Sequence, residues 1–198
     1  MKPQRLEGSK TQGISESLSL RVLVFKRMTA LAFLLLGFSG CGTKSIPAQE
    51  NGVLDLRDRL SVLSREAGGS YSPHFAASRN GIDRDSILLI PPITVRASLK
   101  GIAGHATLVG IATPVYNIGD GMQLDVVLIQ EGNRRTVYTR YYDPGRKTED
   151  RKWIPFKIPL DLPQGNDIRI ELRVSAGMQG DLVADWLAVS ELRVIAKT

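Results

Sequence analysis

The sequence has little of what enzymes and metal sites are usually built from. Among its 198 residues there is one cysteine, Cys41, and there are two histidines, His74 and His105. One cysteine excludes an intramolecular disulfide, and two distant histidines give no Cys/His cluster with zinc spacing. The motifs G-x-S-x-G, G-x-G-x-x-G, G-x-x-x-x-G-K-[ST] and H-E-x-x-H are also missing, which lowers the expectation of catalysis. We therefore expect a protein that is not an enzyme, since nothing positive supports a hydrolase.

The expected folded part of the chain also lacks a strong excess of positive charge. The whole sequence has a net charge of +6, but residues 1–40 hold six Lys or Arg and two Glu, so the remainder carries only +2. A domain that binds nucleic acid needs a basic face of its own. The charge distribution therefore argues against nucleic acid as a partner.

No apolar run is long enough to cross a membrane. The run from Met28 to Phe38 is shorter than the about 20 residues that a membrane-spanning helix needs. It follows a Lys-Arg pair at 26–27 and precedes small residues at 39–40. A basic segment, a short apolar segment and small residues in this order are typical of a secretory signal peptide.

The end of this segment, Phe38-Ser39-Gly40-Cys41, resembles a bacterial lipobox. The resemblance implies that the signal peptide is cut before Cys41 and that Cys41 carries a lipid anchor. Acyl chains contribute ~0.8 kcal/mol per buried CH₂, so several chains hold such a protein on a membrane. By resemblance to enterobacterial lipoproteins, a residue other than Asp at position 42 favours the outer membrane, and here it is Gly42. The alternative interpretation is an ordinary buried cysteine at the end of a core helix.

This interpretation divides the chain into three parts. Residues 1–40 are the leader and signal peptide, residues 41–52 are a small, polar tether, and residues 53–198 are the folded domain. Residues 1–21 are polar and add nothing to a signal, so we expect the true start of the protein at 22–24, through an alternative initiation codon.

The folded domain is predicted to begin with one short helix. Leucines at 56, 60 and 63 within Val53 to Glu66 have the i, i+4, i+7 spacing of an amphipathic helix. Residues 70–85 show no period and are predicted to form a loop. The aromatic residues of that loop, Tyr71 and Phe75, form either a rival ligand surface or a plug over the core.

From Ser86 onward the sequence predicts strands. They cover 87–90, 93–99, 105–116, 123–130, 136–142, 154–160, 167–174 and 186–195. Glu131-Gly132-Asn133 predicts a hairpin turn. Pro91-Pro92 is expected at a strand end or edge, and Pro155 and Pro159 place their strand at an edge or in a solvent-facing row. Short antiparallel strands at roughly ten-residue spacing predict an all-β sandwich.

Two motifs stand out in the second half, D-R-K-W at 150–153 and D-x-x-x-D-W at 181–186. With the strand order around them, they resemble jelly-roll domains of the galactose-binding-like superfamily, over about Leu54 to Val194. More closely, they resemble such domains appended to bacterial envelope glycosyltransferase-like and sulfatase-like proteins, and carbohydrate modules beside glycosidases. The resemblance implies an antiparallel jelly-roll β-sandwich that binds sugars or packs against a neighbouring domain.

The residues around these motifs have a structural and a functional interpretation. In the structural one, Arg151 and Asp185 form a buried pair that pins two loops. The residues predicted to be structural are Arg151, Trp153, Asp181, Asp185 and Trp186. In the functional one, two tyrosines and Trp153 form a sugar-stacking platform beside polar partners that include Asp150. The predicted ligand-binding residues are Tyr141, Tyr142, Asp143 and Arg146.

No cofactor is predicted, although four acids could supply the oxygen ligands of a structural Ca²⁺. These acids are Asp120, Asp143, Asp181 and Asp185. Two functions stay open for the protein, and both place it in the bacterial cell envelope on a lipid anchor. One is a binding module for envelope carbohydrate. The other is a structural or assembly lipoprotein that contacts another envelope protein and binds no sugar.

Overall fold

The structure is a computed structural model that describes residues 52–66, 68–164, 167–177, 180 and 183–197. These residues form an all-β domain of eleven strands and two short 3₁₀ helices, which confirms the predicted fold class. The leader, Cys41, the tether up to residue 51, and Asp181 lie outside the described residues.

The strands follow one another along the chain with mostly short connections. The elements are β1 (Val53–Asp55), η1 (Arg57–Arg59), β2 (Ser61–Arg65), β3 (Ser70–Arg79), β4 (Ile82–Ile90), β5 (Ile93–Ser98), β6 (Gly104–Pro114), β7 (Met122–Gln130), β8 (Asn133–Tyr142), η2 (Thr148–Asp150), β9 (Ile154–Leu162), β10 (Ile168–Ala176) and β11 (Leu187–Ala196). The strand pairs are all antiparallel.

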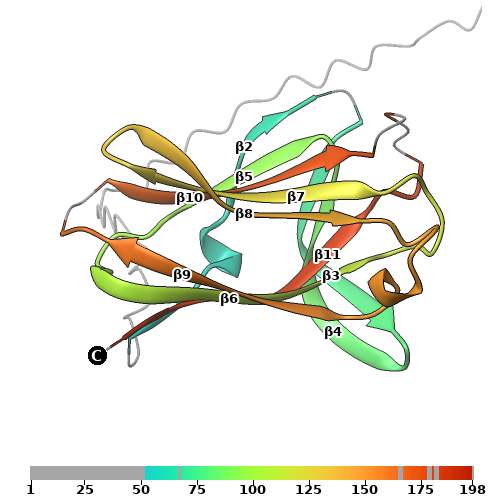
Figure 1. Cartoon of the computed structure of the whole chain (residues 1–198), viewed down its shortest axis with the longest axis horizontal. Coiled ribbons are helices and arrows are strands. Elements are labelled where there is room, and N and C mark those ends of the chain that lie inside the picture. The colour runs from blue at the N-terminus through green and yellow to red at the C-terminus, as the bar shows by residue number, and fades with distance from the viewer. Residues whose placement is uncertain (1–51, 67, 165–166, 178–179, 181–182, 198) are drawn as a thin grey trace, which may run out of the picture. The chain divides into compact units, whose positions relative to one another are not determined.

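Two sheets form the layers of the sandwich. The six-stranded sheet has the order β3-β4-β11-β6-β9, with β1 also paired to β11, and the five-stranded sheet has the order β2-β5-β10-β7-β8. Figure 1 shows β5, β10, β7 and β8 in the upper layer and β6 and β9 in the lower one. Strands that are neighbours in sequence often lie in different sheets, as β4 and β5 do, which is the arrangement of a jelly roll.

One hydrophobic core lies between the sheets. Leu124, Ile170 and Leu172 of the five-stranded sheet and Leu108 and Phe156 of the six-stranded sheet belong to the same buried cluster. Their alternate neighbours face away from it, as the period-two pattern predicts. The β9 prediction is confirmed in detail, because the apolar residues of Ile154–Leu162 are buried and its alternate residues, the two prolines included, are exposed on an edge strand.

A glycine and an aromatic pair fix how β9 closes the core. A Cβ added at Gly110 of β6 would lie 2.3 Å from Cζ of Phe156 on β9, so only glycine leaves room for that ring. The Phe156 ring stacks on Tyr138 of β8, with centroids 5.6 Å apart. Because β8 and β9 belong to different sheets, this pair joins the two layers at one edge.

The predicted helix over 53–66 is wrong. The segment forms β1, the three-residue η1 and β2 instead. Leu54 and Leu56 are buried in the common core while Val62 and Leu63 stay exposed, so the leucines do not share one helical face. Here strand pairing with β11 and β5 overrides the helical spacing.

The loop predicted over 70–85 is also wrong, since these residues form the β3–β4 hairpin of the six-stranded sheet. Its turn is Asn80-Gly81, and both residues have positive φ, as a tight hairpin requires. Tyr71 packs against the main core, as one of the two alternatives held, whereas Phe75 packs against a separate small cluster with Trp153 and Ala188. Among the described residues, no helix is both long and apolar enough to cross a membrane.

Candidate functional site

The loop after β8 does not form the predicted stacking platform. Tyr142 is 0% exposed and belongs to the core cluster. The guanidinium carbon of Arg140 lies 5.1 Å from the centroid of its ring, and burial raises the pKa of the Tyr142 phenol. A ring in the core cannot stack on a sugar, so the prediction for Tyr142 is wrong.

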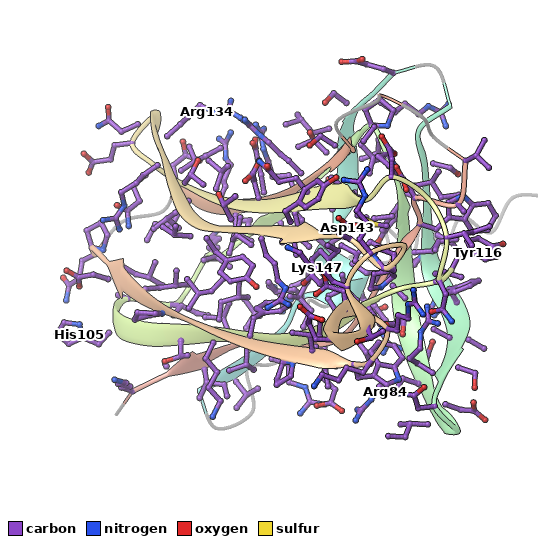
Figure 2. The ribbon with its side chains drawn as sticks, turned by 45° about the vertical axis from the view of Figure 1, so that its right-hand side comes forward. Arg84, His105, Tyr116, Arg134, Asp143 and Lys147 are labelled. Atoms are coloured by element: carbon purple, nitrogen blue, oxygen red, sulfur yellow. The ribbon has the colours of Figure 1, made fainter. Side chains whose placement is uncertain are left out.

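Asp143 and Arg146 hold the turn of this loop together. Asp143 is buried, and its Oδ1 accepts a hydrogen bond of 3.2 Å from the backbone N–H of Arg146. The side chain of Arg146 is exposed, and Figure 2 shows Asp143 and Lys147 close to the same turn. Tyr141, in contrast, lies opposite Gln123 in the strand register and donates its hydroxyl to the carbonyl of Asp120.

The predicted pair of Arg151 and Asp185 does not form, so that prediction is wrong. Arg151 donates Nε to the carbonyl of Pro144 at 2.6 Å and Nη2 to that of Gly145 at 3.1 Å. It therefore fastens its own loop rather than two loops. The buried carboxylate of Asp185 accepts a hydrogen bond of 3.4 Å from the backbone N–H of Gly177.

Trp153 and Trp186 differ in their surroundings. Trp153 is buried and donates Nε1 to the carbonyl of Ile82 at 3.1 Å, as expected of a structural tryptophan. Trp186 is half-buried and meets Tyr116 edge to face, with ring centroids 5.2 Å apart.

Two of the four acids considered for Ca²⁺ meet. Burial, a hydrogen bond with Asp120 and the charge of Asp120 raise the pKa of Asp185 to about 7. Asp143 is engaged elsewhere, and among the described residues no three His, Cys, Asp or Glu side chains gather as a metal site would require. Since Ca²⁺ also takes backbone carbonyls and waters as ligands and Asp181 lies outside the described residues, the calcium site stays a prediction.

The outward face of the five-stranded sheet carries the densest polar arrangement in the described part of the chain. Ile170 and Leu172 of β10 face the core, so Glu171 and Arg173 face outward. Arg96 of β5 is the register neighbour of Glu171 on one side, and Val127 of β7 is its neighbour on the other.

Glu171 is 0% exposed although it lies on an outward face, because three arginines cover it. Its Oε1 accepts from Nε and Nη2 of Arg96 at 3.0 and 2.6 Å. Its Oε2 accepts from Nε and Nη2 of Arg173 at 3.3 and 3.0 Å, and from Arg134. Burial by itself would raise the pKa of Glu171, but the hydrogen bonds from Arg96 and Arg173 and the charge of Arg134 lower it below its usual value.

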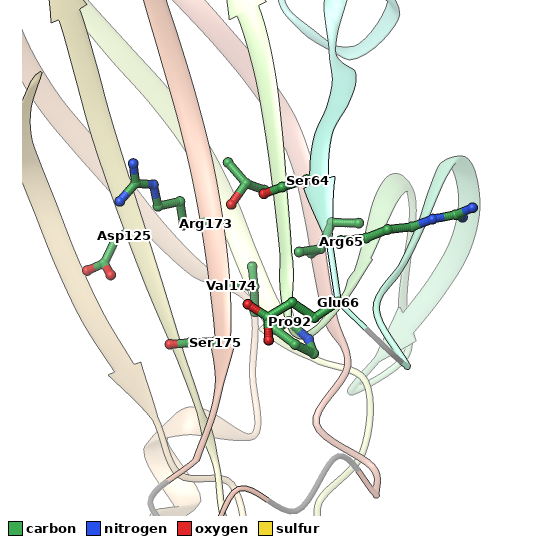
Figure 3. A pocket seen from close by; sticks show the side chains of 10 residues that line it. Ser64, Arg65, Glu66, Pro92, Asp125, Arg173, Val174 and Ser175 are labelled. Carbon is green, nitrogen blue, oxygen red and sulfur yellow. The ribbon is translucent and has the colours of Figure 1, made fainter.

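A small pocket opens on the same face, next to this network. It has a volume of about 210 Å³, and its lining includes Asp125, Arg173, Thr94, Ser64 and Arg65. Asp125 accepts hydrogen bonds from Nε2 of Gln123, at 3.1 and 3.0 Å, and from Oγ1 of Thr139, at 2.7 Å. Figure 3 shows Asp125 and Arg173 on one side of the pocket and Ser64, Arg65 and Glu66 on the other. Residues that carry a carboxylate, a guanidinium and hydroxyls therefore line a space for one small polar group.

The sequence analysis missed this face as a site, although it held part of the signal. The alternation in 167–174 already places Glu171 and Arg173 on the polar side of a strand. What brings Arg96, Arg134 and Asp125 beside them is the strand order β5-β10-β7-β8. That order pairs strands far apart in the chain, and the alternation within one strand does not reveal it.

Comparison with known proteins places the chain by fold only. No protein-family model matches it. Over 76 residues the chain is 32% identical to an uncharacterized protein of Archaeoglobus fulgidus. The matched segment covers 38% of this chain and 19% of that protein. The chain thus spans about a fifth of the length of this curated relative.

Two solved structures have a similar fold at very low sequence identity. One contains the CBM51-2 and INT domains of Clostridium perfringens ZmpB, with a TM-score of 0.50, 10% identity, and coverage of 73% of this chain and 31% of that one. The other is the CBM22-1–CBM22-2 tandem of Paenibacillus barcinonensis Xyn10C, with a TM-score of 0.50, 8% identity, and coverage of 77% and 51%. At this level of identity the similarity concerns the fold alone, and it confirms the predicted jelly-roll β-sandwich.

Proposed function

We propose that the protein is a non-catalytic carbohydrate-binding module whose ligand lies on the outward face of the five-stranded sheet. The observation that carries the proposal is the pocket lined by Asp125 and Arg173 on that face. Solved carbohydrate-binding modules with the same fold support it. Because similarity at this level concerns the fold alone, the chemistry of the face has to carry the function.

The face offers the contacts that a sugar requires. A sugar hydroxyl can donate to the carboxylate of Asp125 and accept from the guanidinium of Arg173, both of which line the pocket. The register row next to these residues runs from Ser175 through Gln123 to Tyr141. The partly buried ring of Tyr141 then supplies an aromatic surface for the apolar side of a sugar ring. Of the four predicted ligand residues, Tyr141 is the one that we keep in the site.

Tyr141→Ala is expected to weaken glycan binding about tenfold, since it removes a stacking ring worth roughly 0.5–1.5 kcal/mol together with its buried area. Tyr141→Phe keeps the ring and loses the hydroxyl that donates to Asp120, so its affinity is expected to stay within about threefold of the wild type. A glycan array would select the ligand and titration calorimetry would measure both variants. Equal affinities of the wild type and the alanine variant would remove Tyr141 from the site, and an array without any hit would reject the proposed function.

The anchoring part of the proposal rests on the segment before Cys41. The mature protein starts at Cys41, carries a lipid there and belongs to the cell envelope, with the outer membrane favoured by Gly42. A basic segment, a short apolar segment and small residues before a lone cysteine support this proposal.

Labelling of expressing cells with an alkyne fatty acid is expected to tag the wild-type protein and not Cys41→Ser. The substitution removes the thiol that would carry the thioether, and the chain has no other cysteine. The readout is in-gel fluorescence after click chemistry, together with the membrane fraction of each form. Equal labelling of both forms would disprove lipidation at Cys41.

One surface favours the second function, contact with another envelope protein. Tyr116, Ile118 and Val183 are 39%, 63% and 68% exposed, and Trp186 packs against Tyr116. Exposed aromatic and aliphatic side chains in neighbouring loops are typical of a protein contact. Figure 2 shows Tyr116 at the end of the sandwich away from Arg134.

A further inference from the structure

The arginine network on the five-stranded sheet has more positive charge than its acid needs. Three guanidinium groups surround one carboxylate, that of Glu171. Each guanidinium has five N–H donors, and Glu171 takes two from Arg96, two from Arg173 and one from Arg134. The network therefore keeps a surplus of two positive charges and further donor groups.

The surplus charge lies at the surface. The side chains of Arg134 and Arg173 are 46% and 40% exposed, whereas Glu171 is 0% exposed. Arg134 on β8 crosses the intervening strand β7 to reach Glu171 on β10. Val127 and Ile129, which face outward on β7, are buried. A ligand on this face thus meets guanidinium groups and not the carboxylate that holds them in place. Fixed guanidinium groups lose little further side-chain freedom when they bind an anion.

The network adjoins the sugar pocket without being the same site. Arg173 belongs to both, while Arg96 and Arg134 do not line the pocket. A ligand whose sugar ring sits at Asp125 and Arg173 can therefore extend a substituent along β10 and β7 toward Arg134. A neutral hydroxyl would gain little there, but a carboxylate or sulfate group would gain charge-assisted hydrogen bonds.

We propose that the glycan bound by this domain is acidic, and that Arg134, with Arg96 and Arg173, binds its carboxylate or sulfate groups. The proposal rests on the proposed carbohydrate-binding function and adds the chemical class of the ligand. Glu171 acts as a positioning residue, because its carboxylate orients the three guanidinium groups and does not contact the glycan. Uronic acid carboxylates and sulfate esters present the same anionic chemistry.

The test compares two neighbouring arginines of β8 in the full-length chain. Arg134→Gln removes a guanidinium of the network. Arg135→Gln makes the same change of charge one residue away, at an exposed side chain. The register partner of Arg135 is Leu128, which faces the core, so Arg135 does not belong to the row of the arginine network. Two pairs of polymers are compared. Polygalacturonate and its fully methyl-esterified form differ in the carboxylate, and dextran sulfate and dextran differ in the sulfate. Affinity is measured by titration calorimetry at low and at raised salt.

The wild type is expected to bind at least one acidic polymer more than tenfold tighter than its neutral counterpart, and less tightly as salt is added. Arg134→Gln should lose about tenfold in affinity for that polymer, the usual effect of one charge-assisted hydrogen bond. Arg135→Gln should lose less than about twofold by the same conversion. The carboxylate and sulfate pairs show which anion is preferred, and any leader left on the chain contributes equally to both variants.

The possible failures can be told apart. Equal binding of acidic and neutral polymers, or equal losses in the two variants, would overturn the acidic-ligand proposal while leaving a carbohydrate-binding module in place. Binding to no polymer together with no hit on a glycan array would reject both. Binding to phosphatidylglycerol vesicles that depends on Arg134, without binding to any acidic glycan, would assign the network to a membrane surface and overturn the proposal.

Discussion

Asp150→Ala is expected to lower the free energy of unfolding by about 3 kcal/mol, the low end of the range for breaking a buried ion pair. The carboxylate of Asp150 is 1% exposed. Its Oδ1 accepts from Nη2 of Arg140 at 2.8 Å, and its Oδ2 accepts from the backbone N–H of Asp143 at 2.8 Å. Removal of the carboxylate leaves a partly buried guanidinium and a buried N–H without an acceptor, and both carry a desolvation cost.

Glu149→Ala provides the matched control, because Glu149 is exposed and lies next to Asp150 in η2. Its effect should stay within about 0.5 kcal/mol, as for most surface substitutions. Urea unfolding followed by tryptophan fluorescence measures both. A double-mutant cycle with Arg140→Gln should give a coupling energy of about 1 kcal/mol or more. Equal stability of the two alanine variants would show that the Asp150 carboxylate does not hold this loop.

This loop shows why strand positions were easier to predict than side-chain partners. Within the D-R-K-W motif we predicted a structural role for Arg151 and a place beside a sugar for Asp150, and in the structure both residues fasten the loop. The prediction nevertheless paired Arg151 with Asp185, whereas Arg151 bonds backbone carbonyls and Asp150 bonds Arg140. Backbone carbonyls are acceptors at every position, so the residue types in a sequence do not reveal which of them a guanidinium will use.

Strands such as β9 and β10 were predictable because their core residues recur with a period of two. In β9 and β10 the core residues alternate with outward ones, and such a pattern fits only one register. The segment before β3 carries no such pattern. All five residues of β2 are exposed, so burial does not impose a period of two, and a spacing of leucines that suits a helix misled the prediction.

The prediction for Tyr142 failed for a related reason. Tyr141 and Tyr142 have the same chemistry, and one of two adjacent residues in a strand must face inward. Their register places Tyr142 opposite the buried Met122 and Tyr141 opposite Gln123 on the outward face. The choice between them depends on where β8 pairs with β7 and on the irregularity between Val126 and Val127, which composition does not indicate.

Asp185→Asn is expected to make the protein more stable at pH 8, by up to on the order of 4 kcal/mol. The Asp185 carboxyl is 0% exposed, and burial, its hydrogen bond with Asp120 and the charge of Asp120 raise its pKa from 3.8 to about 7. The folded protein thus binds the Asp185 proton more tightly than the unfolded chain does. The stabilisation that comes from protonated Asp185 is fully present below pH 3.8, and it is lost as the pH rises toward about 7.

The asparagine can keep the contacts of the protonated carboxyl with Gly177 and Asp120. Its amide oxygen can accept from the N–H of Gly177, and its NH₂ group can donate to Asp120, without an ionisable group at position 185. The unfolding free energy of the variant should accordingly change less than that of the wild type between pH 5 and pH 8. Asp83→Asn is the matched control, since it makes the same change at an exposed side chain.

The same measurement tests the calcium prediction. If no Ca²⁺ site forms around Asp120 and Asp185, 1 mM Ca²⁺ should not change the stability of the wild type at pH 8 by more than about 0.5 kcal/mol. If Ca²⁺ binds there with the help of a residue such as Asp181, it should stabilise the wild type by several kcal/mol, through the usual linkage of binding to folding. Asp185→Asn would then be the less stable form at pH 8 in calcium, opposite to the stabilisation expected of the substitution without a bound ion.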